Sequence, residues 1–318
     1  VNLLQIGLRN RQRHELVKAV IKQGDGIGVF VSNIGMAVTL ILAAQIGWNG
    51  VFTIYGIVAT VFALLCFALT QEHTKEISET LEKDKSNRMR AKEFLMAIFK
   101  NKYALLLFAV VLLQQMAGGV NIAGGTYYFR YVVGNLAYFN RMAPYNLAFS
   151  LIGMVMAGWL VKRIGPKKMF VFGGIAASIC YAIIGLLNGT HVAILLPLVG
   201  LSSMFGMVFM VANFAAFTAA AVSYGEAKNG IRLEGITSSV LNIGIKIGTA
   251  FGTALFGTIV GAAGYQEGGV EQTAETVRAI GGAFVGIPLT TTLLVTILVL
   301  FVYRIQKDMA KLDAKENA

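Results

Sequence analysis

A single lysine lies in the middle of a long apolar stretch of this sequence. Residues 233–252 read LEGITSSVLNIGIKIGTAFG, and Lys246 is the only charged residue there after Glu234. A helix of this length can cross a bilayer, where a central lysine costs about 2.5–3.5 kcal/mol. Along a helix Lys246 is about 18 Å from Glu234, which is too deep for easy escape to the membrane surface. We therefore expect Lys246 to meet water or a carboxylate.

The residues around Lys246 predict a helix with two different faces. Positions three, four and seven residues apart share one face of a helix. The polar residues that share the Lys246 face are Ser239, Asn242, Thr249 and Thr253. The small residues that lie nearly opposite, at four-residue spacing, are Gly244, Gly248 and Gly252. Such spacing lets a neighbouring helix approach closely, so we expect a packing face and a polar face.

We interpret Lys246 as lining a polar cavity, where it contacts a substrate or a coupling acid. Asn242 and Thr249 offer hydrogen bonds from the same face. The alternative is a structural salt bridge inside the bundle. Asp25, near the start of the first apolar stretch, is the candidate carboxylate, although it could instead pair with Lys22. If neither Asp25 nor water serves Lys246, its partner lies outside this chain.

A second group of polar residues lies in the apolar sequence of residues 105–134. Gln114, Gln115 and Asn121 occur there together with two Gly-Gly pairs. Transporters place binding sites at interrupted helices near the membrane midplane, which makes Gln115 a candidate site residue. The alternative is a glycine kink that serves packing alone.

The composition predicts an all-α integral membrane protein that carries these residues on spanning helices. The chain has 318 residues, of which 56% are hydrophobic and 14% charged, and its mean hydropathy is +0.67. Soluble domains are about 25% charged. Eight apolar stretches have near-spanning length: 26–46, 50–70, 104–124, 146–161, 169–188, 193–222, 235–263 and 281–303.

The distribution of positive charge predicts the orientation of these helices. A net charge of +11 could indicate a nucleic-acid partner. However, 23 of the 27 Lys and Arg residues fall on one set of alternate connections and 3 on the other. This pattern follows the positive-inside rule, so we expect no nucleic-acid partner and expect both ends of the chain in the cytoplasm.

The connections divide the predicted helices into two groups. Residues 1–70 hold two spans, and residues 104–305 hold a six-helix bundle. Residues 71–103 are predicted as a cytoplasmic linker, whose apolar residues between cations favour a helix at the membrane surface. Residues 306–318 form a cytoplasmic tail. Because the chain begins with Val inside a basic connector, we also expect that upstream sequence is missing.

Motifs of the common enzyme and metal-site classes are absent from the sequence. There is no HExxH, GxSxG or GxxxxGK pattern, so we expect no enzyme activity. Cys66 and Cys180 fall in different spans, which disfavours a disulfide scaffold, and two cysteines are too few for a metal framework.

The segment before Lys246 resembles the signature of a known family. Residues 224–236 read YGEAKNGIRLEGI, and with Lys246 they are similar to the glycoside–pentoside–hexuronide:cation symporters. The matching positions are Tyr224, Gly225, Glu226, Lys228, Arg232, Glu234 and Lys246. TYYFRYVVG at 126–134 and RQRHEL at 11–16 are weaker points of resemblance.

The resemblance implies a major-facilitator-type helix bundle in which the eight predicted spans correspond to helices five to twelve of twelve. Helices one to four, which carry acidic residues for the coupling cation in this family, would then be missing partners of this chain. The sequence departs from the family at Ala220 and Ser223, where Asp is frequent, and at Leu241, where a polar residue can occur. The role of those family residues is therefore in doubt here.

The function implied is cation-coupled symport, with Na⁺ or H⁺, of a sugar or glycoside across the inner membrane by alternating access. No other cofactor is expected. In this hypothesis Lys246 links the cation and sugar sites. Tyr127, Tyr128 and Tyr131 either stack on a pyranose or lie at the membrane interface, and we favour the interface. The alternatives are a non-transporting receptor or scaffold on a carrier fold and an inactive truncated fragment.

Overall fold

The computed structural model describes residues 39, 45–47, 49–65, 101–229, 234–267, 271–305 and 308–309. The helix Asn49–Leu65 and the helices from residue 101 onward belong to two separate compact units. Asn49–Leu65 is apolar and falls in the second predicted stretch. Asp25, nearly all of the first stretch and the linker between residues 71 and 100 lie outside the described residues.

The larger unit contains the six spans predicted from residue 104 onward. Its described part has six helical segments long and apolar enough to cross a membrane and contains no strand. Five of them are α5 (Lys102–Tyr127), α6 (Ala137–Ile164), α7 (Pro166–Leu187), α10 (Glu234–Ala262) and α11 (Ala274–Phe301). The sixth is composite: α8 (Val192–Ser203), the π-helical η3 (Met204–Phe209) and α9 (Phe214–Asn229). These six spans confirm the all-α membrane fold class.

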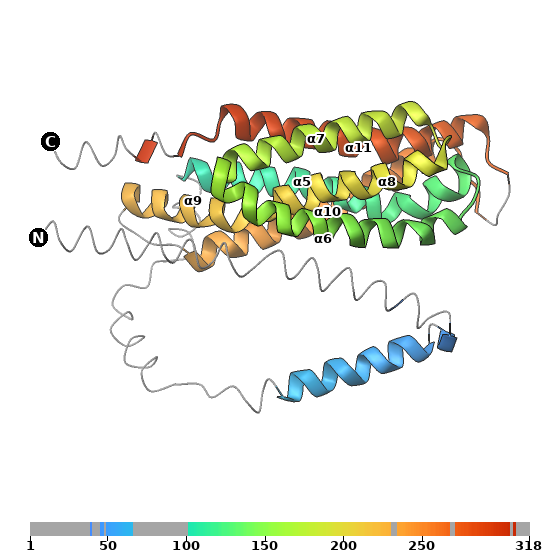
Figure 1. Cartoon of the computed structure of the whole chain (residues 1–318), viewed down its shortest axis with the longest axis horizontal. Helices are drawn as coiled ribbons and strands as arrows, with labels where there is room; N and C mark the ends of the chain where they lie inside the picture. Colours follow the sequence, from blue (N-terminus) through green and yellow to red (C-terminus); the bar gives the residue numbers. More distant parts are fainter. Residues whose placement is uncertain are drawn as a thin grey trace, which may run out of the picture. The chain divides into compact units, whose positions relative to one another are not determined.

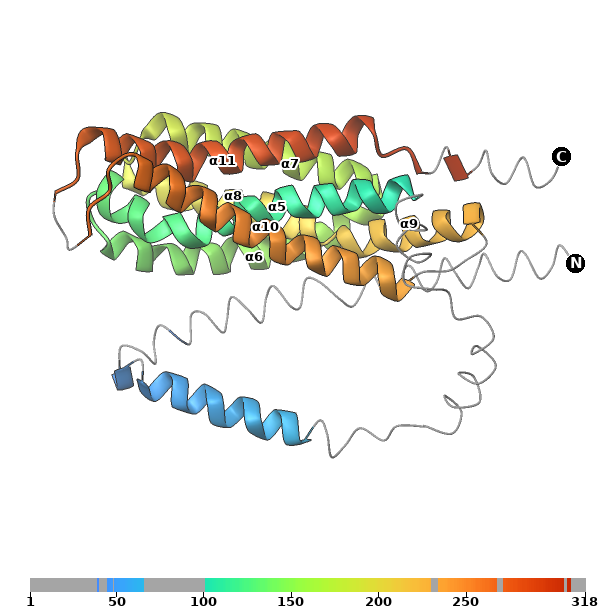
Figure 2. The ribbon, with the colours of Figure 1, turned by 180° about the vertical axis from the view of Figure 1, so that it is seen from behind.

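The helices of this unit run side by side as an elongated bundle. Figures 1 and 2 show α7 and α11 along the upper edge, α6 and α10 along the lower edge, and α5 and α8 between them. α5 occupies a central position because it packs on both α10 and α11. Most of its apolar side chains are therefore buried, whereas α6 leaves much of its surface exposed.

α5 and α10 pack backbone against backbone. A Cβ atom added to Gly252 would lie 2.1 Å from the Met116 carbonyl oxygen, and one added to Gly248 would lie 2.3 Å from that of Leu112. From the other side, a Cβ on Gly119 would lie 2.2 Å from the Thr249 carbonyl oxygen. No side chain fits in these places, so the predicted glycine packing face of residues 244–252 is confirmed.

The Gly-Gly pairs do not interrupt α5, and the expectation of an interruption there was wrong. The α-helix is continuous through both pairs, up to Tyr127. The pairs are instead packing positions: Gly119 meets α10, and a Cβ on Gly124 would contact Phe256 and Phe284. Only after Tyr127 does the helix widen, into the π-helical η2 (Tyr128–Val132). The glycines therefore serve packing, and the role of Gln115 as a site residue stays a prediction.

Two predicted boundaries also move. The short fourth stretch, 146–161, is part of the 28-residue α6, which continues through Pro144. The polar connection predicted at 264–280 is shorter, because Thr273 caps α11 and accepts a hydrogen bond from the Thr276 N–H at 3.2 Å. Hydropathy predicted these helices too short, because their end residues are polar where they lie at the membrane surface.

Asn101 joins the start of α5 to α9. Its Oδ1 accepts hydrogen bonds from the backbone N–H groups of Tyr103 and Ala104, and its Nδ2 donates to the Ala221 carbonyl at 2.8 Å. The side chain is 5% exposed. A Cβ atom on Gly225 would lie 2.7 Å from this Nδ2, so the glycine leaves the space that the amide occupies.

We expect Asn101→Ala to lower the free energy of unfolding by about 2 kcal/mol, because it removes a helix cap and a buried hydrogen bond to α9. Asn135→Ala is the matched control: Asn135 also caps a helix, through the Ala137 N–H at 2.9 Å, but at an exposed site. Denaturant titration of both variants in detergent measures the difference. Equal losses of unfolding free energy in the two variants would contradict a stabilising role for the Asn101 hydrogen bond to α9.

Candidate substrate and coupling site

The exposed face of α10 carries the polar residues that were predicted to share it. Ser239, Asn242, Lys246 and Thr253 are exposed in the bundle, and Thr249 is half-buried. The face is not uniformly polar, because Ile243, Ile247 and Phe251 are also exposed beside the stripe. The geometry of a two-faced helix is thus as predicted, while the role of the polar face stays a prediction.

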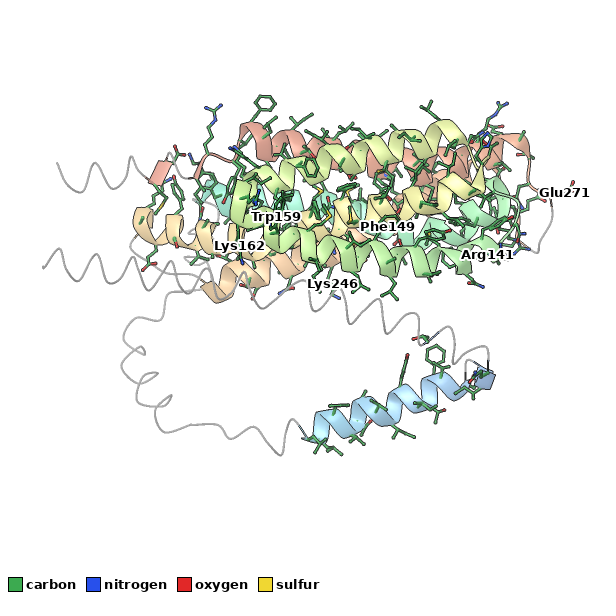
Figure 3. All side chains as sticks on the ribbon, in the orientation of Figure 1. Arg141, Phe149, Trp159, Lys162, Lys246 and Glu271 are labelled. Atoms are coloured by element: carbon green, nitrogen blue, oxygen red, sulfur yellow. The ribbon has the colours of Figure 1, made fainter. Side chains whose placement is uncertain are left out.

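Lys246 points out of the bundle at its lower edge, away from α7 and α11 (Figure 3). It forms no ion pair with any described residue of the chain. The sequence between residues 101 and 225, which builds α5 to α8 and most of α9, contains no Asp or Glu. The described helices therefore offer no support for the alternative of a salt bridge within the bundle. Asp25 lies outside the described residues, so its pairing with Lys246 stays a prediction.

Gln115 and Thr249 lie at the seam where α10 packs on α5. A Cβ atom on Gly248 would lie 3.0 Å from the Gln115 Cβ, so Gln115 packs against the glycine face of α10, nearly opposite Lys246. Thr249 donates its hydroxyl hydrogen to the Ile245 carbonyl of its own helix at 2.9 Å. That bond leaves the Thr249 oxygen able to accept another hydrogen bond. Asn242 and Lys246 therefore share the exposed face of α10, Thr249 is half-buried, and Gln115 lies on the glycine side.

Tyr128 does not share that side. Its side chain is 1% exposed, and its ring stacks on Phe284 at a centroid distance of 4.5 Å. The ring is part of the core between η2 and α11, at the far end of α5 from Asn101. A sugar contact for Tyr128 stays a prediction, and it would require this core to open.

Tyr127 and Tyr131 form a different aromatic group, together with Tyr265 from the connection after α10. The ring of Tyr127 meets that of Tyr265 edge-on at 5.3 Å, and the hydroxyl oxygens of Tyr131 and Tyr265 are 3.3 Å apart. The hydrogen bond to Tyr131 and partial burial raise the pKa of Tyr265 to about 12. A cluster at the end of a spanning helix suits the membrane interface, the interpretation we favoured for these tyrosines.

Sequence reasoning missed an internal set of polar contacts between helices. Asn121 donates to the Tyr181 hydroxyl at 3.2 Å, which ties α5 to α7. Gln114 donates to the Gly206 carbonyl at 3.1 Å, which ties α5 to η3. Asn213 is 1% exposed and donates to the Phe209 carbonyl at 2.6 Å. The sequence did offer a signal for these contacts. Polar residues within a membrane-spanning stretch usually face the interior of the bundle.

Comparison with known proteins places this bundle in a family. Residues 10–307 match the family described as MFS/sugar transport protein. The chain belongs to this family. The match covers both described units and confirms the resemblance to glycoside–pentoside–hexuronide:cation symporters that the residues around Lys246 carry.

Several members of the MFS/sugar transport family resemble the chain. An isoprimeverose transporter of Lactiplantibacillus pentosus is 28% identical over 282 residues, which cover 86% of this chain and 56% of that protein. A putative sulfoquinovose importer of Escherichia coli K12 is 23% identical over 81% of this chain and 54% of that protein. A raffinose carrier protein of Pediococcus pentosaceus is 28% identical over 75% of this chain and 36% of that protein.

The chain spans about half the length of these curated relatives. The family and the printed names are those of transporters, which confirms the expectation that the chain is not an enzyme. The same family and the six spanning segments make it a multi-pass membrane protein.

Proposed function

We propose that the protein transports a sugar or glycoside by alternating access, in symport with Na⁺ or H⁺. The family match and the printed substrates of the relatives, which include isoprimeverose and raffinose, support a sugar as substrate. The coupling cation is the only cofactor in this proposal.

The observation that carries the proposal is the position of Lys246. It lies near the middle of the 29-residue α10, on the face opposite the glycines that pack on α5, and it is exposed from the bundle. Packing does not require a cation there, and the bilayer penalises one. A water-filled path for a polar substrate removes that penalty. Lys246 would balance the charge of the coupling acid, and Asn242 and Thr249 would bind sugar hydroxyls.

In this proposal, the acidic residues that pair with Lys246 belong to helices that precede the chain in the family's twelve-helix fold. The coverage of about half of each relative is consistent with such helices. Asp25 is the candidate within the chain. The predominance of cations on one set of connections supports an inner-membrane location with both ends of the chain in the cytoplasm.

Uptake measurements test the proposal. The protein at its natural full length is expressed in cells that lack sugar carriers, and radiolabelled isoprimeverose and raffinose are supplied with and without a Na⁺ or pH gradient. We expect one sugar to accumulate above its external concentration and to leak out when the gradient is collapsed. Binding of both sugars without flux would overturn transport in favour of a receptor. Parallel expression of residues 1–318 alone tests the fragment hypothesis, which predicts no uptake.

A further inference from the structure

The composite sixth span departs from α-helical geometry near its middle. Between α8 and α9 the chain passes through the π-helical segment Met204–Phe209 and then through a turn at residues 212–213. Widened or broken turns release backbone carbonyls from α-helical bonding, and inside a membrane these need other donors. π-helical segments inside longer helices occur often at functional sites.

Two side-chain amides supply those donors. Asn213 bonds the Phe209 carbonyl from within the same span. Gln114 bonds the Gly206 carbonyl from α5, so it connects the break to the helix that holds α10. Of the two, only Gln114 fixes the break relative to another helix.

Gln114 is an unusual residue for this place. Its side chain is 7% exposed, and its Oε1 is buried with no hydrogen-bond partner among the described residues. A buried amide oxygen without a partner destabilises the fold. A leucine or methionine would avoid that cost but would leave the Gly206 carbonyl without the Gln114 donor. Either choice leaves one buried polar group unpaired, so stability alone does not select a glutamine here.

We propose that Gln114 is a positioning residue for a hinge at Met204–Asn213, about which α9 moves relative to α8 during transport. The proposal rests on the proposed transport function. In the present conformation the Gln114 Nε2 donates a hydrogen bond to the Gly206 carbonyl, and this bond fixes the position of the hinge relative to α5. Its unpaired Oε1 is free to accept a hydrogen bond in another conformation, so the amide can exchange one partner for another when the segment rearranges.

The other end of α9 is held firmly, which directs motion to the hinge. Ala221 accepts the hydrogen bond from Asn101, and the ring of Tyr224 meets that of Tyr103 edge-on at 4.8 Å. Phe217, in the first turn of α9, packs on Tyr303 at a ring-centroid distance of 4.6 Å, so α9 is held along its length up to one turn from the break. A segment fixed at one end and broken at the other bends at the break.

Two substitutions change the hinge in opposite directions. Gln114→Leu removes the amide and keeps the volume. Gly206→Ala keeps the carbonyl and limits backbone freedom, and it fits because the added Cβ would lie 3.7 Å from the Ala177 Cβ. Ser178→Ala is the matched control, because Ser178 is also buried but bonds only Gly174 of its own helix, at 2.8 Å.

Hydrogen exchange on the purified full-length protein in lipid nanodiscs, without sugar, is the first measurement. We expect amide exchange over residues 204–217 to rise about fivefold in Gln114→Leu and to fall about fivefold in Gly206→Ala, with Ser178→Ala unchanged. Exchange within twofold of wild type in both hinge variants overturns the proposal. A uniform rise over all helices in Gln114→Leu also overturns it, because that indicates a general structural role.

Uptake kinetics with isoprimeverose are the second measurement. We expect both hinge variants to lower Vmax about tenfold and to leave KM within twofold, because the substrate contacts on α10 are intact. A KM that rises in step with the loss of Vmax overturns the positioning role. If the wild-type protein takes up no isoprimeverose, the proposal that it transports this sugar fails. The hydrogen-exchange result then tests the hinge independently of transport.

Discussion

Lys246→Ala should abolish accumulation of sugar against a gradient and should leave the protein at least as stable as the wild type. Removing the cation deletes the group that we assign to link the coupling acid and the sugar. Because a water-filled path already spares the lysine the penalty for a charge in the membrane, removing the charge should not lower stability. Uptake at saturating gradient and thermal unfolding in detergent measure the two effects.

The stability measurement distinguishes the two interpretations of this lysine. A structural salt bridge predicts a loss of about 3–5 kcal/mol on removal of one partner, because the other charge stays buried. A cavity role predicts no loss. Ile247→Ala is the matched control, since Ile247 is the next residue on α10 and is 47% exposed. Full accumulation by Lys246→Ala would refute the coupling role.

Gly252→Val should prevent formation of the bundle. The valine Cβ would lie 2.1 Å from the Met116 carbonyl oxygen, a distance that no side-chain rotation relieves, because both atoms have positions set by their backbones. Overpacking of this kind costs about 3 kcal/mol where neighbours can shift, and here the neighbour is a helix backbone. We expect folded protein, measured by size-exclusion chromatography, to fall at least about fivefold.

Gly257→Val controls for the change in helix propensity from glycine to valine in the same helix. A Cβ atom on Gly257 would meet no atom within 4 Å. This variant should therefore fold to the wild-type level. If Gly252→Val and Gly257→Val behaved alike, the close approach of α5 and α10 would be excluded.

The parts of the fold that hydropathy and small-residue spacing encode were predictable. The six spans from residue 104 onward and the glycine face of α10 follow from patterns that repeat along the sequence. Lys246 could be placed on the opposite face because its angle to Gly248 is fixed by helix geometry. The family resemblance near Tyr224 added what these patterns alone do not provide, the expected class of function.

The parts that depend on contacts between distant segments were not predictable. Gly-Gly pairs in α5 suggested a broken helix, but neighbouring helices use them for packing. The real break lies after α8, where Asn213 and Gln114 satisfy freed carbonyls, and only the latter was noticed in the sequence. Tyr128, the first residue of η2, is buried in the core against Phe284, a contact with a distant helix that the sequence does not reveal.

The repeat in the α5–α10 interface limits how these two helices can slide. Gly244, Gly248 and Gly252 face Phe108, Leu112 and Met116 in order, so both sides repeat every four residues. A half-turn displacement would drive Cβ atoms and carbonyl oxygens into each other, whereas a shift by four residues, about 6 Å, would bring two of the three glycines against matching partners again. Relative to α5, Lys246 can therefore stay in place or move along the helix axis by about one turn, but it cannot stop at a fraction of a turn.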